Sequence, residues 1–183
     1  MELVLRGRCW VLGDHIHCDG DMMPMHFATL RETRPEVLRE HVLSGIDPDF
    51  PKKLSPGDII VAGRGFGSGH PHNQGMLGLA AAGVGVVAES IPRGSFRNII
   101  NAAVPVLPHC PGVTAHCMTG DEMEVNFETG RFSNLTSGEQ LNYPPLDERL
   151  LDTIRIGGWV PMVKRRIEYM RQQGLGPFAP STQ

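Results

Sequence analysis

The sequence predicts an α/β protein in which helices cover a mainly parallel sheet and a β ribbon follows near the C-terminal third. Two strand–helix–strand units succeed one another between residues 58 and 107, and such units give parallel strands with right-handed crossovers. Residues 122–143 then alternate apolar and polar side chains, which is typical of a hairpin with one buried face. The 22 glycines and 15 prolines separate short apolar runs, which indicates many tight turns.

The N-terminal quarter is predicted to hold one strand, one loop and one helix. VLRGRCWVL at 4–12 has the apolar and β-branched content of a strand. Residues 13–34 are rich in Gly, Asp, His and Met, so we expect a long functional loop. Residues 35–44 predict a helix, since proline is tolerated in a first helical turn and an apolar face follows.

The remaining elements follow from apolar runs and their flanking glycines. We expect buried strands at 58–63, 84–89 and 104–107, alternating with helices at 72–83 and 94–103. Gly83 ends the first of these helices. The hairpin is expected to turn near Thr129–Gly130, and residues 145–172 to form one long helix. Residues 1–173 are therefore predicted to be a single domain, and residues 174–183 a C-terminal tail.

Composition excludes several classes of protein. A length of 183 residues, with 40% apolar and 20% charged residues, fits one globular domain. The formal net charge of −3 gives no reason to expect nucleic acid or a membrane surface as a partner. No apolar run approaches the ~20 residues that span a bilayer, and charges interrupt the N-terminal segment where a signal peptide needs an apolar stretch. We expect a cytoplasmic protein. None of its four cysteines stands in a C-x-x-C pair, so we expect free thiols in or near the core.

The segment GDIIVAGRGFGSGHPHNQG at 57–75 carries a family resemblance. It is similar to the signature of the small subunits of 3-isopropylmalate dehydratase and homoaconitase, in the aconitase superfamily. Three further segments resemble other motifs of that family in the same order: GDHIHCDGDMMP at 13–24, SIPRGSFRNIINAAVPVL at 90–107 and IGGWVPMVKRR at 156–166. The resemblance implies a three-layer β/β/α swivelling domain of the aconitase type.

The resemblance also implies a function. It points to the small subunit of a heteromeric hydro-lyase, which dehydrates and rehydrates a hydroxy di- or tricarboxylic acid in leucine biosynthesis. The 4Fe-4S iron–sulfur cluster is expected on a large partner subunit, with no cofactor on this chain. Two alternatives stay open: a non-catalytic assembly module of the same fold, and a self-sufficient metal-dependent enzyme. A homo-oligomer of the isolated chain also stays open.

The glycine-rich turn is the predicted substrate site. Gly67 and Gly69 let the backbone approach a ligand closely. The free N–H groups at the start of the next helix favour an anion such as a dicarboxylate. Where the family has Ser-Ser-Arg-Glu, this chain has His70, Pro71, His72 and Asn73.

This replacement changes the expected chemistry. On the family alignment, His70 stands at the serine base, His72 at the carboxylate-binding arginine and Ser68 at a preceding cysteine. Neutral histidine is a competent base near pH 7, so His70 and Ser68 are the catalytic candidates. His72 and Asn73 are expected to bind the substrate, although an imidazole lacks the bidentate fork of arginine.

The loop at 13–34 supplies further candidates. Asp19 or Asp21 corresponds to a family aspartate that orients this loop, and Arg31 is a candidate for gripping a carboxylate. His15 and His17 form one H-x-H pair, and His70 and His72 form another. In the alternative of a self-sufficient metal-dependent enzyme, these four imidazoles would bind a divalent metal. Arg97 and Asn98 are expected to hold their helix against a loop by hydrogen bonds.

Overall fold

One curled sheet of seven strands organises the chain, in the order β4-β3-β2-β1-β5-β6-β7. The computed structural model describes residues 3–175, and the predicted tail lies outside the described residues from position 176 onward. The central strand β1 (Val4–Leu12) has two kinds of neighbour. Its C-terminal half pairs in parallel with β2 (Ile59–Ala62), and its N-terminal half pairs antiparallel with β5 (Glu122–Asn126).

The parallel half and the ribbon are both confirmed. Beyond β2 the sheet continues in parallel through β3 (Gly85–Ala88) and β4 (Val106–Leu107). Beyond β5 it continues antiparallel through β6 (Arg131–Asn134) and a third ribbon strand, β7 (Gln140–Asn142), that the sequence did not predict. All four residues of β2 and of β3 are buried, as expected for parallel strands covered on both faces.

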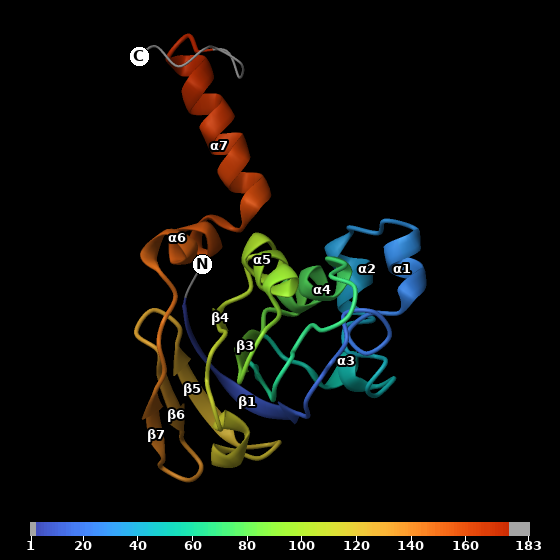
Figure 1. The fold of residues 1–183 in the computed structure, drawn as a ribbon, viewed down its shortest axis with the longest axis vertical. Coiled ribbons are helices and arrows are strands. Elements are labelled where there is room, and N and C mark those ends of the chain that lie inside the picture. The colour runs from blue at the N-terminus through green and yellow to red at the C-terminus, as the bar shows by residue number, and fades with distance from the viewer. Residues whose placement is uncertain (1–2, 176–183) are drawn as a thin grey trace.

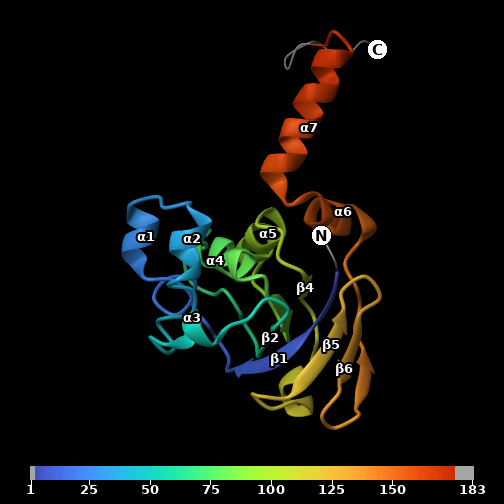
Figure 2. The ribbon, with the colours of Figure 1, turned by 180° about the vertical axis from the view of Figure 1, so that it is seen from behind.

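Helices lie beside the parallel half of the sheet, as Figures 1 and 2 show. The two that follow β2 and β3 are α4 (Gln74–Ala82) and α5 (Arg93–Asn101). Shorter helices complete this layer and the ribbon side: α1 (Met25–Thr29), α2 (Pro35–Arg39), α3 (Phe50–Lys53) and the 3₁₀ helix η1 (Val113–His116). The sequence did not predict α1, α3 or η1, because helices of four or five residues leave no full period to detect.

The predicted helix at 145–172 is wrong as a single element. The structure has α6 (Glu148–Ile156) and α7 (Trp159–Gln172), separated by Gly157 and Gly158. Both glycines have positive φ, +97° and +94°, which a continuing helix cannot contain. The predicted helix at 35–44 likewise ends early, at Arg39. After α6 the chain changes direction, and α7 projects away from the rest of the protein (Figure 1).

A buried carboxylate fixes the junction of β1 and β2. Asp58, 4% exposed, accepts hydrogen bonds from the Arg8 and Ser55 backbone N–H groups at 2.9 and 3.0 Å. It also accepts from Trp10 Nε1 at 2.8 Å. Three donors satisfy a charge whose burial is otherwise unfavourable. In the described part of the chain, no helix is both long and apolar enough to cross a membrane.

Candidate functional site

Two loops meet at the C-terminal ends of neighbouring strands β1 and β2. The His15 N–H donates to the Arg64 carbonyl at 2.7 Å, and the Cys18 N–H donates to the Ser68 carbonyl at 2.9 Å. His17 and Ser68 form a parallel β-bridge. The loop of residues 13–24 and the turn of residues 63–73 are therefore held together by main-chain bonds. Ligands of open α/β sheets bind at this edge.

Gly67 is a position in the turn where a side chain does not fit. Its φ is +80°, and a Cβ at this position would lie 2.8 Å from Ser95 Cβ and 3.0 Å from Met76 Cε. Its carbonyl accepts hydrogen bonds from Ser95 Oγ and, at 3.2 Å, from Cys18 Sγ. The backbone of the turn is thus clamped between α5 and the loop after β1.

Asp19 and His72 form the central contact between the two loops. His72 Nδ1 lies 2.8 Å from each carboxylate oxygen of Asp19, and the side chains are 37% and 16% exposed. Asp21 instead accepts from the His17 N–H at 2.9 Å and contacts His17 Nδ1 at 3.2 Å. Of the two predicted aspartates, Asp19 therefore faces the turn, while Asp21 braces its own loop.

The other predicted side chains of the turn differ in their surroundings. His70 is exposed, and its ring centroid lies 5.2 Å from that of His72. Ser68 Oγ and Asn73 Oδ1 are buried without a hydrogen-bond partner among the described residues. A buried polar atom without a partner is unfavourable by about 1–3 kcal/mol, so both atoms are candidates for a ligand or a partner's donor. Gly69, with φ +82°, is exposed beside His17.

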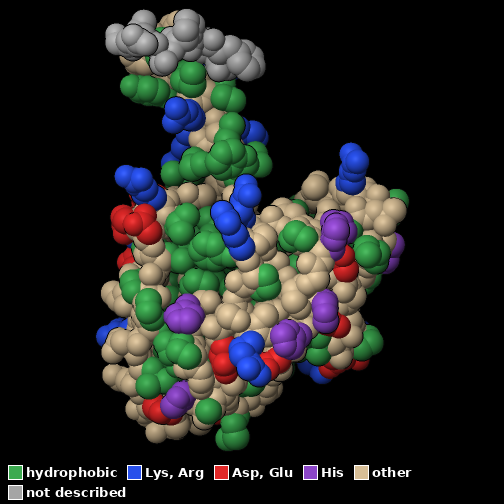
Figure 3. Space-filling view, viewed as in Figure 1, with side chains coloured by type: hydrophobic (Ala, Val, Ile, Leu, Met, Phe, Trp, Pro, Cys, Tyr) green, Lys and Arg blue, Asp and Glu red, His purple; other side chains and the backbone are tan. Residues whose placement is uncertain are grey.

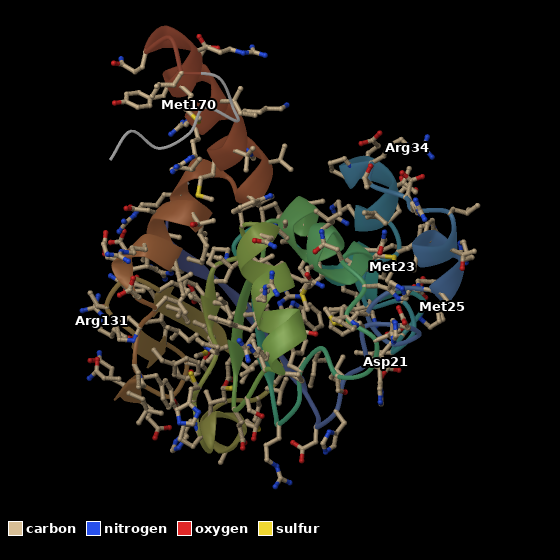
Figure 4. The ribbon with its side chains drawn as sticks, turned by 45° about the horizontal axis from the view of Figure 1, so that its top comes forward. Asp21, Met23, Met25, Arg34, Arg131 and Met170 are labelled. Atoms are coloured by element: carbon tan, nitrogen blue, oxygen red, sulfur yellow. The ribbon has the colours of Figure 1, made fainter. Side chains whose placement is uncertain are left out.

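Arg31 lies on the rim rather than in the turn. It is exposed and has a φ of +53°. The segment that carries it reaches the start of α4, because Gln74 Nε2 donates to the Glu32 carbonyl at 3.2 Å. In the same segment, hydrogen bonds from Arg34 lower the pKa of Glu32 to about 2. Figure 4 shows Asp21, Met23, Met25 and Arg34 on this one side of the molecule.

The four histidines of the metal alternative are not gathered into one cluster. His15 lies against Gly65, and His17 and His72 each face an aspartate. Among the residues that the structure describes, no group of three or more His, Cys, Asp or Glu side chains could hold a metal ion. The geometry gives the self-sufficient metal enzyme no support.

Two residues that clamp the turn were missed from the sequence. Cys18 was expected to be only a buried thiol, and Ser95 carried no signal, because a serine in a first helical turn is common on any helix. Their Sγ and Oγ atoms lie 3.4 Å apart, and burial raises the pKa of Cys18. The expected role of Asn98 is confirmed: its Nδ2 donates to the Pro71 carbonyl at 2.6 Å and ties α5 to the turn.

Comparison with known proteins gives a consistent answer. No family model matches the chain. The isopropylmalate/citramalate isomerase small subunit of Methanocaldococcus jannaschii is 41% identical over 168 residues, covering 91% of this chain and 98% of that protein. The 3-isopropylmalate dehydratase small subunit 1 of Methanopyrus kandleri is 40% identical over 166 residues, covering 90% and 95%.

A solved structure agrees with these relatives. The crystal structure of a 3-isopropylmalate dehydratase from Methanocaldococcus jannaschii superposes with a TM-score of 0.82 at 28% identity. The superposition covers 93% of this chain and 99% of that one. The chain belongs to the family of 3-isopropylmalate dehydratase small subunits.

Proposed function

We propose that this chain is the small half of a two-subunit hydro-lyase, and that its glycine-rich turn contributes substrate-binding and base groups to an active site completed by a larger partner. The observation that carries the proposal is the contact between Asp19 and His72, which places an oriented imidazole beside the turn. The names of the relatives support a hydroxy dicarboxylate of the isopropylmalate or citramalate type as substrate.

The turn is suited to a carboxylate. Asn73 precedes α4 without capping it by a side-chain hydrogen bond, so the first N–H groups of that helix are free of side-chain partners. Positive backbone polarity at a helix start favours an anion. We assign one substrate carboxylate to the backbone of Gly69 and to Asn73, with Arg31 at the rim for the second. The predicted part of Gly67 in binding is not supported, because its N–H already donates to the Ile16 carbonyl at 2.8 Å.

The base is assigned to the histidine pair. An ionised Asp19 can only accept, so the proton of a neutral His72 resides on Nδ1 and Nε2 is left with a lone pair. An imidazole oriented in this way by a carboxylate is suited to take a proton. His70 is the second candidate for the base, since it stands at the position of the family serine. Ser68, whose Oγ is buried, is the third.

The iron–sulfur cluster is assigned to the partner subunit. All four cysteines of this chain are buried, and its described residues offer no set of three metal ligands. Thiolates on this chain therefore do not fit a cluster. We place the complex in the cytoplasm, where free thiols stay reduced.

The test is turnover of a hydroxy dicarboxylate by the chain reconstituted with its large subunit. We expect His72→Gln to lower kcat by about 10²–10⁴-fold, the usual contribution of a general base. Asp19→Asn should lower kcat less and alter its pH profile, because it disturbs the orientation of the imidazole and leaves the imidazole itself in place. His109→Gln, an exposed histidine outside the site, is the matched control.

The outcomes separate the candidates. If His70→Gln abolishes turnover and His72→Gln does not, the base is His70. If His70→Gln, His72→Gln and Ser68→Ala all leave kcat unchanged while the complex still assembles, the chain is a non-catalytic assembly module and the proposed function is wrong.

A further inference from the structure

Two of the four cysteines meet in the fold. All four are buried, but their sulfur atoms have different partners. Cys110 Sγ donates to the Leu107 carbonyl, and Cys18 Sγ lies against the glycine-rich turn of the site. The thiols of Cys9 and Cys117 are instead hydrogen-bonded to each other. The fold thus brings together two thiols that stand 108 positions apart in the sequence.

Main-chain hydrogen bonds hold together the two segments that carry this pair. Cys9 lies in β1, and its N–H donates to the Asp121 carbonyl at 2.8 Å. The Gly120 N–H donates in return to the Cys9 carbonyl at 2.9 Å. The Asp121 carboxylate also accepts from the N–H of the residue that follows Cys117, at 2.9 Å. Residues 117–121 are therefore fixed against β1 by contacts that do not involve the thiols.

The two sulfur atoms differ in how a reagent can reach them. Cys9 is fully buried, whereas Cys117 is 8% exposed and lines a hollow of about 260 Å³. His116, Asp121 and Glu139 are among the polar residues around it. Figure 3 shows histidine and acidic side chains at the lower end of the molecule, where the yellow-green coil of η1 lies in Figure 1. A water molecule occupies about 30 Å³, and hydrogen peroxide is little larger, so the hollow admits it to Cys117.

We propose that Cys9 and Cys117 form a reversible oxidation site at which a hydroperoxide converts the two thiols into a disulfide. First, the Cys117 thiolate attacks a peroxide oxygen: an S–O bond forms, the O–O bond breaks, and the leaving hydroxide takes up a proton to become water. Then the Cys9 sulfur attacks the Cys117 sulfur: an S–S bond forms, the S–O bond breaks, and hydroxide leaves as water with the Cys9 proton. The two thiols lose two electrons in all, and the peroxide is reduced to two water molecules.

The order of these steps follows from the surroundings of each sulfur. The hydrogen bond from Cys9 lowers the pKa of Cys117, and this effect outweighs burial and the nearby carboxylates of Asp121 and Glu139. The same hydrogen bond, together with burial, raises the pKa of Cys9. Because the thiolate is the reactive form of a cysteine, Cys117 meets the oxidant first. Cys9, shielded and in contact with it, then resolves the sulfenic acid.

The disulfide ties β1 to the segment that leads into β5. A bond that closes so long a loop restricts the unfolded chain, so it should raise the melting temperature by about 4–16 °C. Since β1 also leads into the loop of residues 13–24, the bond secures the strand from which that loop of the site begins. Cytoplasmic reductants return the pair to thiols, which makes the bond a transient state.

The test is the number of free thiols in the full chain, counted in urea before and after the native protein is treated with a small excess of hydrogen peroxide. We expect four thiols before treatment and two after it, and four again after a dithiol reductant. Fragmentation of proteolytic peptides should assign the bond to Cys9 and Cys117. A thiol count is unaffected by the sulfoxide that exposed Met118 forms with peroxide.

Three variants separate the roles of the sulfur atoms. Cys117→Ser should keep its three remaining thiols, because Cys9 is shielded from peroxide. Cys9→Ser should hold Cys117 as a sulfenic acid, which a reagent specific for that group captures. Cys110→Ser is the matched control: it removes a buried thiol that donates to a backbone carbonyl, and it should still form the bond.

Several results would overturn the proposal. One is a wild-type chain that keeps all four thiols after peroxide treatment, and another is a bond that includes Cys18 or Cys110. A disulfide between two chains, seen as a doubled mass without reductant, would do the same. An oxidised chain that melts at a lower temperature than the reduced one would show that the two sulfur atoms do not meet in the native fold.

Discussion

Replacing Gly67 by alanine should destabilise the chain and disable its site together. The left-handed conformation at φ +80° is unfavourable for alanine by about 1–2 kcal/mol. The added Cβ would also lie 2.8 Å from Ser95 Cβ, and forcing a methyl group into packed surroundings is unfavourable by about 1–3 kcal/mol. We therefore expect the free energy of unfolding to fall by about 2–5 kcal/mol.

Gly112 is the matched control. It has a φ of +75°, but nothing lies within 4 Å of the Cβ that alanine would add. Gly112→Ala should lose only the conformational part, about 1–2 kcal/mol. Urea denaturation at one fixed protein concentration measures both variants, with an unchanged m-value as evidence that stability alone has changed. Equal losses for the two variants would show that Ser95 and Met76 do not close the space around Gly67.

Three further predictions rest on single contacts. Asp58→Ala leaves three donors without an acceptor and should destabilise the fold by about 3–5 kcal/mol, whereas exposed Asp49→Ala should change stability by less than about 0.5 kcal/mol. NMR titration should give Glu32 a pKa of about 2; this carboxylate stabilises the folded state above its unfolded value of 4.5 and loses that contribution as the pH falls toward 2, and Arg34→Ala should move the midpoint back up. Burial raises the pKa of Cys110 to about 12, so a thiol reagent at pH 8 should not modify it until urea unfolds the chain, and rapid labelling of the native protein would contradict its burial.

The strands could be predicted from the sequence because their residues are apolar on a short, regular pattern. Residues 58–63 and 84–89 stand close to the observed β2 and β3, which are buried throughout. The break between α6 and α7 could not be placed, since apolar residues recur at helical spacing on both sides of it. What makes Gly158 necessary is a tertiary contact: a Cβ there would lie 2.2 Å from the carbonyl oxygen of Asn101 on α5.

The site could be predicted in outline and not in its contacts. The resemblance of residues 57–75 led to the turn, and the turn lies beside the loop after β1 as expected. The sequence could not distinguish Asp19 from Asp21, because both are acidic and two positions apart. Only the pairing of the two loops decides that Asp19 reaches His72. The clamp on the Gly67 carbonyl by Ser95 depends in the same way on how α5 packs.

The two-sided pairing of β1 has a consequence for the order in which the chain is made. Arg8 pairs with Glu122, 114 positions later. At about 5–20 residues per second, a ribosome needs about 6–23 s to bridge that interval. During it, the edge of β1 that will receive β5 has no partner, and such an edge invites aggregation. Arg6 and Arg8 lie on this stretch, and charged side chains on a waiting edge are how strands avoid pairing with one another. Arg6, which pairs with Glu122 once β5 is in place, is thus also suited to protect this edge while the chain is being made.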